Sequence, residues 1–251
     1  MNEQSAKKLT YKESGVDIDK ADSLKAGLKE TLSTPEARVL NSVGAFSSLY
    51  DLSAFPGITE PVLCLKMEEP GSKQLLASQH GRLPQVGTDL VNHLINDTIM
   101  NGGKPIAILD TVVCGKLDPD VVSALIKTMV EACKKEDCAL VGGETSEQPR
   151  VLDEETYILS AACVGIVDKK KIVDGSTIEV GDQVYAVASN GVHTNGYTLI
   201  RSLIDKIPSL LETQVDGEPF IESVLKPHLC YNTPLQEIFE KILILTLLAS
   251  D

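Results

Sequence analysis

Four polar side chains with ligand chemistry share one face of a predicted helix near the middle of the chain. Taken from the first of them, they lie four, seven and eight residues apart: Asp89, His93, Asn96 and Asp97. Such spacings place side chains next to one another on an α-helix. Two carboxylates, an amide and an imidazole are therefore expected within about two helical turns.

The helix itself is predicted by an apolar face opposite these groups. That face is made by Leu90, Val91, Leu94, Ile95 and Ile99. Gly102 and Gly103 then end the helix, and Pro105 keeps it from continuing. A short strand is expected at residues 106–109, closed by Asp110.

Two interpretations of the polar face remain open. Most amphipathic helices have a solvated polar face, but such faces are rich in Lys, Glu and Arg, and none occurs between Asp89 and Lys104. Oxygen ligands on short side chains are those that hold Mg²⁺. A metal or phosphate site therefore stands beside the solvated face as an alternative.

Composition excludes some partners. The chain has 251 residues, 43% of them hydrophobic, and a formal charge of −13. A protein this acidic does not hold nucleic acid or an anionic membrane through bulk electrostatics. Trp is absent and only 4% of the residues are aromatic, so stacking platforms for bases are not expected either.

The cysteines and the apolar segments indicate a cytoplasmic protein. The six cysteines form no C-x-x-C pair and most lie in apolar runs, so reduced core thiols are expected. The first thirty residues have no apolar segment typical of a signal peptide. The longest apolar run, residues 242–249, is too short to span a bilayer.

Two further stretches could approach a phosphate group. Residues 66–73 have a loop composition, and Gly71, Ser72 and Lys73 offer a backbone N–H, a hydroxyl and an ammonium group. They do not form a P-loop, which needs G-x-x-x-x-G-K-[ST]. A strand at residues 138–141 leads into Gly142, Gly143 and Glu144. This could be a backbone approach to a ligand or an ordinary tight turn.

The remaining pattern alternates helices and strands. Helices are expected at residues 20–31, from Asp118-Pro119 onward, and from Tyr197 to about Ile207. Strands are expected at residues 61–65, 157–167 and 184–187, with a domain boundary near residue 172.

A second polar cluster lies between the last of these strands and the helix that follows it. Residues 189–196 read S-N-G-V-H-T-N-G, an arrangement that can aim backbone N–H groups at an anion. His193 is then either a ligand-facing group or an ordinary loop histidine.

Several blocks together resemble one family, the phosphoribosylformylglycinamidine cyclo-ligases. The blocks are L-T-Y-K-E-S-G-V-D-I-D at 9–19, G-T-D-L-V-N-H-L-I-N-D-T-I-M-N-G-G-K-P at 87–105, C-G-K-L-D at 114–118, C-A-L-V-G-G-E-T-S-E-Q-P at 138–149, and S-N-G-V-H-T-N-G-Y-T-L-I-R at 189–201. Their order and spacing resemble the family from about residue 9 to 235.

The resemblance implies an α+β fold of two domains. Residues 1–171 would be an N-terminal ATP-binding domain whose mixed sheet joins that of a second copy in a homodimer. Residues 172–251 would be part of a C-terminal α/β domain, which in the family continues beyond this point into a T-G-G-G loop.

The resemblance also implies an ATP- and Mg²⁺-dependent ring closure in purine biosynthesis. ATP phosphorylates the amide oxygen of formylglycinamidine ribonucleotide, and the amidine nitrogen then displaces phosphate to give aminoimidazole ribonucleotide. The implied metal ligands are Glu68, Asp89 and Asn96. The implied ATP or phosphate contacts are Gly71, Ser72, Lys73, Asp97, Gly142, Gly143 and Glu144. The implied catalytic residues are His193 and Asn195.

The chain also departs from the family pattern. Family members carry G-T-D-G-V-G-T-K where residues 66–73 read K-M-E-E-P-G-S-K, so that Glu68 replaces an Asp and Glu69 a Gly. The glycine-rich start is altered at residues 41–46 as well. A catalytically silent relative that keeps the dimerising domain and acts as an assembly partner is therefore the alternative function.

Overall fold

The computed structural model describes residues 17–32, 37–41 and 47–241. Three stretches discussed above lie outside the described residues: the first part of the block at 9–19, most of the altered glycine-rich segment at 41–46, and the apolar run at 242–249. None of the described helices is long and apolar enough to cross a membrane.

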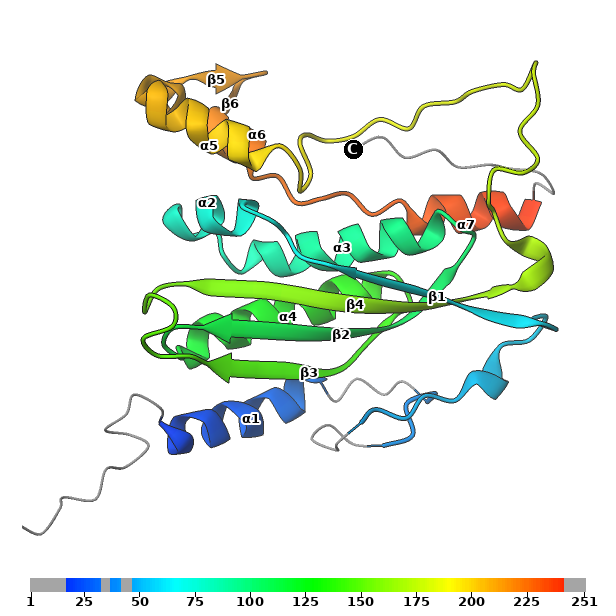
Figure 1. Cartoon of the computed structure of the whole chain (residues 1–251), viewed down its shortest axis with the longest axis horizontal. Helices are drawn as coiled ribbons and strands as arrows, with labels where there is room; N and C mark the ends of the chain where they lie inside the picture. The colour runs from blue at the N-terminus through cyan, green and yellow to red at the C-terminus, as the bar shows by residue number, and fades with distance from the viewer. Residues whose placement is uncertain (1–16, 33–36, 42–46, 242–251) are drawn as a thin grey trace, which may run out of the picture.

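A four-stranded mixed sheet forms the centre of the molecule (Figure 1). Its strands are β1 (Pro61–Glu68), β2 (Lys104–Cys114), β3 (Ala139–Glu147) and β4 (Tyr157–Asp168), in the order β1-β4-β2-β3. The strand β4 is antiparallel to both of its neighbours, whereas β2 and β3 are parallel. The parallel pair requires a crossover, which helix α4 (Pro119–Lys135) supplies.

Helices α3 (Gln85–Ile99) and α4 pack on one face of this sheet and bury the main core. The core joins helix residues such as Leu90 and Met129 to strand residues such as Ile108 and Leu159. Gly87 lies where α3 crosses α4: a Cβ there would be 2.4 Å from Oγ1 of Thr128, so only glycine allows this approach. Helix α1 (Ile18–Leu32) contributes the buried Leu24 to the same core.

Three strands are longer than predicted. Residues 66–68 belong to β1 rather than to a loop, because β4 continues to pair with them as far as Glu68–Ala161. Asp110 does not close its strand, since β4 also pairs with β2 through Cys114. Gly142–Glu144 lie inside β3, not at its end, because pairing with β2 continues to Glu147. In each case pairing with the neighbouring strand determines how long the strand is, and the composition of the strand does not indicate this length.

The structure contains the four helices that the sequence predicts, whereas the helices at Lys73–Gln79, Phe220–Val224 and Asn232–Lys241 were not predicted. Asp118 is the N-cap of α4 and accepts a hydrogen bond from the N–H of Asp120, with Pro119 in the first turn. Helix α5 (Tyr197–Lys206) begins at Tyr197 as predicted. Helix α3 begins at Gln85, one turn before the stretch that was expected to be helical.

The chain after β4 folds back over α2 (Lys73–Gln79) and α3 (Figure 1). Its elements are η2 (Lys169–Lys171), α5, η3 (Pro208–Glu212), β5 (Gln214–Val215), β6 (Glu218–Pro219), α6 (Phe220–Val224) and α7 (Asn232–Lys241), while η1 (Leu52–Ala54) precedes the sheet. The predicted strand at 184–187 is wrong, because no described strand lies beside it and Val184 and Tyr185 are both 86% exposed.

The second face of the sheet carries exposed apolar side chains. They come from β1, β2 and β4, and we refer to them as the open sheet face: Leu63, Leu65, Met67, Leu109 and Ile158. One end of this face is covered by Val39, Tyr50, Phe55 and Ile58. The remainder has no covering layer among the described residues.

Candidate active site

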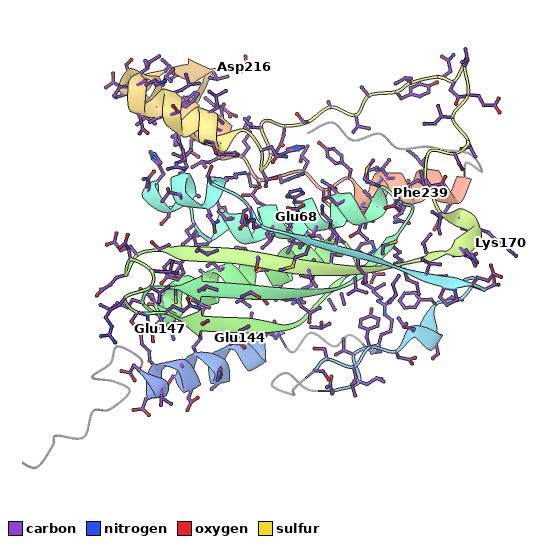
Figure 2. All side chains as sticks on the ribbon, viewed as in Figure 1. Glu68, Glu144, Glu147, Lys170, Asp216 and Phe239 are labelled. Carbon is purple, nitrogen blue, oxygen red and sulfur yellow. The ribbon has the colours of Figure 1, made fainter. Side chains whose placement is uncertain are left out.

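Two carboxylates from different elements meet around one ammonium group. Glu68 lies at the end of β1, and Asp97 lies on α3. Nζ of Lys66 is 2.6 Å from Oε1 of Glu68 and 2.9 Å from Oδ2 of Asp97. Figure 2 shows Glu68 beside α3. The strand brings Lys66 and Glu68 to the same side because residues two apart in a strand share a face.

The helix contributes an imidazole to the same cluster. Nε2 of His93 lies 3.7 Å from Oδ2 of Asp97, one helical turn away. Ligand atoms of Glu68, His93 and Asp97 all lie within 4.8 Å of one another. Two carboxylates and one imidazole at this spacing fit a single cation, so the donor set is compatible with a metal ion.

Three of the four histidines of the chain form a stack beside this cluster. The ring of His228 is 4.0 Å from that of His193 and 5.4 Å from that of His93, centroid to centroid. Oγ1 of Thr194 lies 3.2 Å from Nδ1 of His93 and 3.4 Å from Nδ1 of His228. The loop at 189–196 is thereby joined to α3.

His193 has an unusual backbone and a neutral ring. Its φ of 55° lies in the left-handed region, which is uncommon for a residue other than glycine. Burial, and then the nearby Lys73 and His93, lower the pKa of His193 below its usual value. Its Nε2 is 3.3 Å from the hydroxyl of Tyr231. A neutral imidazole can accept a proton, so the site has a candidate base.

Contacts and burial shift the pKa values of three further groups at the site, Lys66, Glu68 and His228. Contacts with Glu68 and then Asp97 raise the pKa of Lys66 above its ordinary value, so it remains an ammonium. Partial burial works to raise the pKa of Glu68, but the hydrogen bond from Lys66 and nearby positive charge outweigh it and lower the pKa. Burial, followed by the other two histidines, lowers the pKa of His228 to about 3.

Lys73, expected to contact phosphate, and Asp89, expected to bind metal, are buried against each other. Nζ of Lys73 donates to Oδ1 of Asp89 at 2.8 Å and to the carbonyl groups of His193 and Lys226 at 2.9 and 2.7 Å. The N–H of His228 donates to the same carboxylate oxygen. This pair therefore connects α2 and α3 to the loops that contain His193, Lys226 and His228.

The side-chain amide of Asn96 also makes structural contacts, because both its nitrogen and its oxygen form hydrogen bonds with backbone groups. Its Nδ2 donates to the carbonyl group of Leu229 at 2.7 Å, and its Oδ1 accepts from the N–H of Tyr231 at 2.9 Å. Of the three predicted metal ligands, only Glu68 therefore joins the cluster around Lys66. Asp89 and Asn96 instead hold residues 228–231 against α3.

The other predicted contacts fall at two places. Gly71 and Ser72 lie in the short turn before α2, and Oγ of Ser72 is 3.5 Å from Oγ1 of Thr198 at the start of α5. The Asn195 side chain is exposed in the neighbouring loop. These three residues border the cluster.

Gly142, Gly143 and Glu144 are not brought to the cluster. They lie on β3, which β4 and β2 separate from β1, or about 14 Å at ordinary strand spacing. Figure 2 shows Glu144 at the edge of the sheet opposite Glu68. Gly143 faces Asp110: a Cβ there would lie 2.3 Å from the Asp110 carboxylate. A close contact within the protein therefore requires this glycine.

The structure adds three residues that the sequence did not assign to the site: Lys66, His228 and Tyr231. His93 was visible on the polar helix face, but its partners on β1 are about 25 residues away in sequence. His228 lies in L-K-P-H-L, which has no local signal for a ligand. Only the fold reveals that three histidines converge.

Comparisons with known proteins show which family the sequence is similar to. Residues 63–167 match the model of the family described as "AIR synthase related protein, N-terminal domain". The chain is 38% identical over 235 residues to the phosphoribosylformylglycinamidine cyclo-ligase of Cupriavidus taiwanensis, covering 93% of this chain and 67% of that protein. Proteins of the same name from Nitrosospira multiformis and Bacillus cereus are 36% and 37% identical, and the chain covers 68% of each.

Among solved structures, thiamine-monophosphate kinase from Stenotrophomonas maltophilia has a similar fold. The TM-score is 0.52 at 16% sequence identity, over 90% of this chain and 65% of that one. At this identity the likeness concerns the fold alone. The chain thus spans about two thirds of the length of its curated relatives.

Proposed function

This chain belongs to the phosphoribosylformylglycinamidine cyclo-ligase family, and we propose that it closes the imidazole ring of aminoimidazole ribonucleotide in purine biosynthesis. In this reaction ATP phosphorylates the amide oxygen of formylglycinamidine ribonucleotide. The amidine nitrogen then attacks the activated carbon, and phosphate leaves. The reaction takes place in the cytoplasm.

One observation carries the proposal: the carboxylates and the candidate base converge. Glu68 and Asp97 share one ammonium, and His93 connects Asp97 to Thr194, which adjoins His193. A phosphoryl-transfer enzyme needs such proximity, because it works by holding nucleotide, cation and acceptor in line. The three groups come from β1, α3 and the loop before α5.

Roles follow from the chemistry of each group. Glu68 and Asp97 would hold Mg²⁺, which would supply positive charge to neutralise the transferring phosphoryl group. The backbone N–H of Gly71 and the hydroxyl of Ser72 bind phosphate oxygens. His193, held neutral, accepts the proton that the amidine nitrogen loses, and the exposed amide of Asn195 positions the substrate.

The protein acts as a homodimer through the open sheet face. Leu65 and Met67 on this face are 72% and 66% exposed, and Leu63 beside them is 48% exposed. A contiguous apolar strip of this kind on a folded domain is typical of an interface. A second copy offers the same strip, so a twofold interface is self-complementary.

A second function is favoured by the lysines of the site. Lys66 already lies between the carboxylates of Glu68 and Asp97. Lys73 is buried in an ion pair with Asp89. Both features weaken nucleotide binding, while the open sheet face is unaffected. A silent assembly partner would keep the dimer and lose Mg²⁺–ATP affinity, so calorimetry with Mg²⁺–ATP separates the two functions.

The direct test supplies Mg²⁺–ATP and formylglycinamidine ribonucleotide and measures two products. Release of ADP is followed by a coupled assay, and the aminoimidazole is followed by diazotisation of its amine. Both should appear in equal amounts, and His193→Ala should abolish both. The cyclo-ligase function is overturned if neither product forms while the protein is folded and dimeric.

A further inference from the structure

The ammonium of Lys66 lies between two carboxylates that belong to a possible set of metal ligands. It lies 2.6 Å from a Glu68 oxygen and 2.9 Å from an Asp97 oxygen. Those carboxylates and His93 present ligand atoms that lie within 4.8 Å of one another. A positive charge thus already contacts two of the three side chains that could bind a cation.

We propose that Glu68, His93 and Asp97 form a binding site for a divalent transition-metal ion, and that Lys66 takes the place of this ion in the metal-free chain. The site binds metal without nucleotide. Metal and ammonium exclude each other, so Lys66 sets the concentration at which the site fills.

The donor set determines the class of metal. Mg²⁺ strongly prefers oxygen ligands and retains its waters, whereas imidazole with carboxylates suits Mn²⁺, Co²⁺, Fe²⁺ and Zn²⁺. Ligand atoms around such an ion lie about 3–4 Å apart. In the structure these ligand atoms are up to 4.8 Å apart, so the three side chains need to move about an ångström closer together to bind an ion. His93 is therefore the ligand that makes the site prefer a transition-metal ion to Mg²⁺.

The orientation of His93 is fixed from the other side of its ring. Nδ1 lies 3.2 Å from the hydroxyl of Thr194, and this leaves Nε2 directed at Asp97. Metal-binding histidines commonly have their second nitrogen held by a hydrogen bond in this way, which fixes the ring. The side chain of His93 is 14% exposed, so an ion can reach it from solvent.

Lys66 can leave without disturbing the core. Its side chain is 37% exposed, and its partners are 29% and 30% exposed, so the ion pairs are partly solvated. Pairs of this kind contribute little to stability. Two carboxylates with Lys66 carry a net charge of −1, whereas a divalent ion in place of Lys66 neutralises them. A divalent ion at sufficient concentration should therefore replace the Lys66 ammonium between the two carboxylates.

Two of the ligands, Glu68 and Asp97, also belong to the proposed Mg²⁺–ATP site, so the inference rests in part on the proposed function. The test therefore contains no nucleotide. If ring closure is absent but the metal behaviour is found, the proposed function fails and this inference stands. If ring closure occurs but Lys66 has no effect on metal affinity, this inference alone fails.

The experiment titrates chelator-treated protein with CoCl₂ and, separately, MgCl₂ in a calorimeter. Lys66→Met should tighten Co²⁺ binding at least fivefold. His93→Gln should weaken Co²⁺ binding at least tenfold and change Mg²⁺ binding less than twofold. Lys116→Met is the matched control, because it removes a lysine that pairs with Glu154 at 2.8 Å on the surface, away from the site; it should change neither.

A spectroscopic measurement identifies the ligand without relying on affinity. The chain has four histidines, so its imidazole proton signals in the NMR spectrum are few. Small amounts of Mn²⁺ should broaden the His93 signal first and that of His80 least. The inference is overturned if Lys66→Met and His93→Gln, both folded by circular dichroism, bind Co²⁺ within twofold of the parent protein.

Discussion

Nζ of Lys73 lies 2.8 Å from Oδ1 of Asp89, and each side chain is only 1% exposed. Burial raises the pKa of Asp89 and lowers that of Lys73, while their mutual attraction opposes both shifts. A lysine that looks like a phosphate ligand in the sequence is in this chain a structural cation. It connects α2 to α3 and to the loops around residues 193 and 226.

Removing one partner of this pair should be costly. Lys73→Met leaves Asp89 charged and buried without its partner, and such changes typically cost about 3–5 kcal/mol of unfolding free energy. Urea denaturation measures this loss. Lys104→Met is the control, because its pair with Asp137 is exposed and should be worth less than about 1 kcal/mol. Equal losses in the two variants would contradict a structural role for Lys73.

Helices α1, α3, α4 and α5 could be predicted because their signals are local, whereas α2, α6 and α7 were missed. Asp118 and Pro119 mark the start of α4, and the cap forms as the sequence indicates. Strand lengths were underestimated because a partner strand sets them: β1 extends to Glu68 only through its pairing with β4. The hairpin β5–β6 was missed although Asp216-Gly217 is a turn signal, and both residues have positive φ.

The site was predicted in part. The polar face of α3 could be read from spacing, but spacing did not reveal which polar groups would be buried. Asp89 faces Lys73 and the core, whereas Asp97, two turns later, reaches Lys66 and His93. That division depends on where α2 and residues 226–231 pack, and these contacts span more than 100 residues of sequence.

Asp110 should make stability fall as the pH rises. Burial raises its pKa from 3.8 to about 7, so between these values the folded chain binds a proton that the unfolded chain does not. The free energy of unfolding should therefore decrease through this interval. Asp110→Asn cannot ionise, and its stability relative to the parent should increase from pH 5 to pH 8 by up to about 3 kcal/mol.

Urea denaturation of both proteins at several pH values measures this difference, and taking the difference cancels contributions from other groups. Asp205→Asn, on the exposed surface of α5, is the control and should follow the parent at every pH. A constant difference between Asp110→Asn and the parent would show that Asp110 does not titrate in this range.

The open sheet face should hold two copies together. Leu65→Arg places a charge in the middle of the strip, where a dimer would bury it unpaired, and should convert the protein to a monomer. Leu199→Arg is the matched control, since Leu199 on α5 is 66% exposed and lies off the sheet. Sedimentation velocity at micromolar concentration measures both. A parent protein that sediments only as a 27.0 kDa monomer would exclude this dimer.

Asp97 should matter for nucleotide binding and little for folding. Its side chain is 30% exposed, so Asp97→Ala removes no core packing and should cost less than about 1 kcal/mol of stability. Affinity for Mg²⁺–ATP should fall at least tenfold, because one of two cation-binding carboxylates is lost. Calorimetry that finds equal affinity in both proteins would remove Asp97 from the site.

Glu69 should weaken nucleotide binding through its charge. It is exposed in the turn between Glu68 and α2, beside the residues proposed to contact phosphate. A carboxylate a few ångströms from a polyphosphate in a solvated site costs about 1 kcal/mol, or a few-fold in affinity. Glu69→Gln keeps the size and removes the charge, so Mg²⁺–ATP should bind about three- to fivefold tighter, and less so at high salt. Glu144→Gln removes an equivalent exposed charge at the far edge of the sheet and should leave the affinity unchanged. If both variants gain the same affinity for ATP relative to the parent, net charge alone explains the gain. The nucleotide phosphates then do not lie beside this turn.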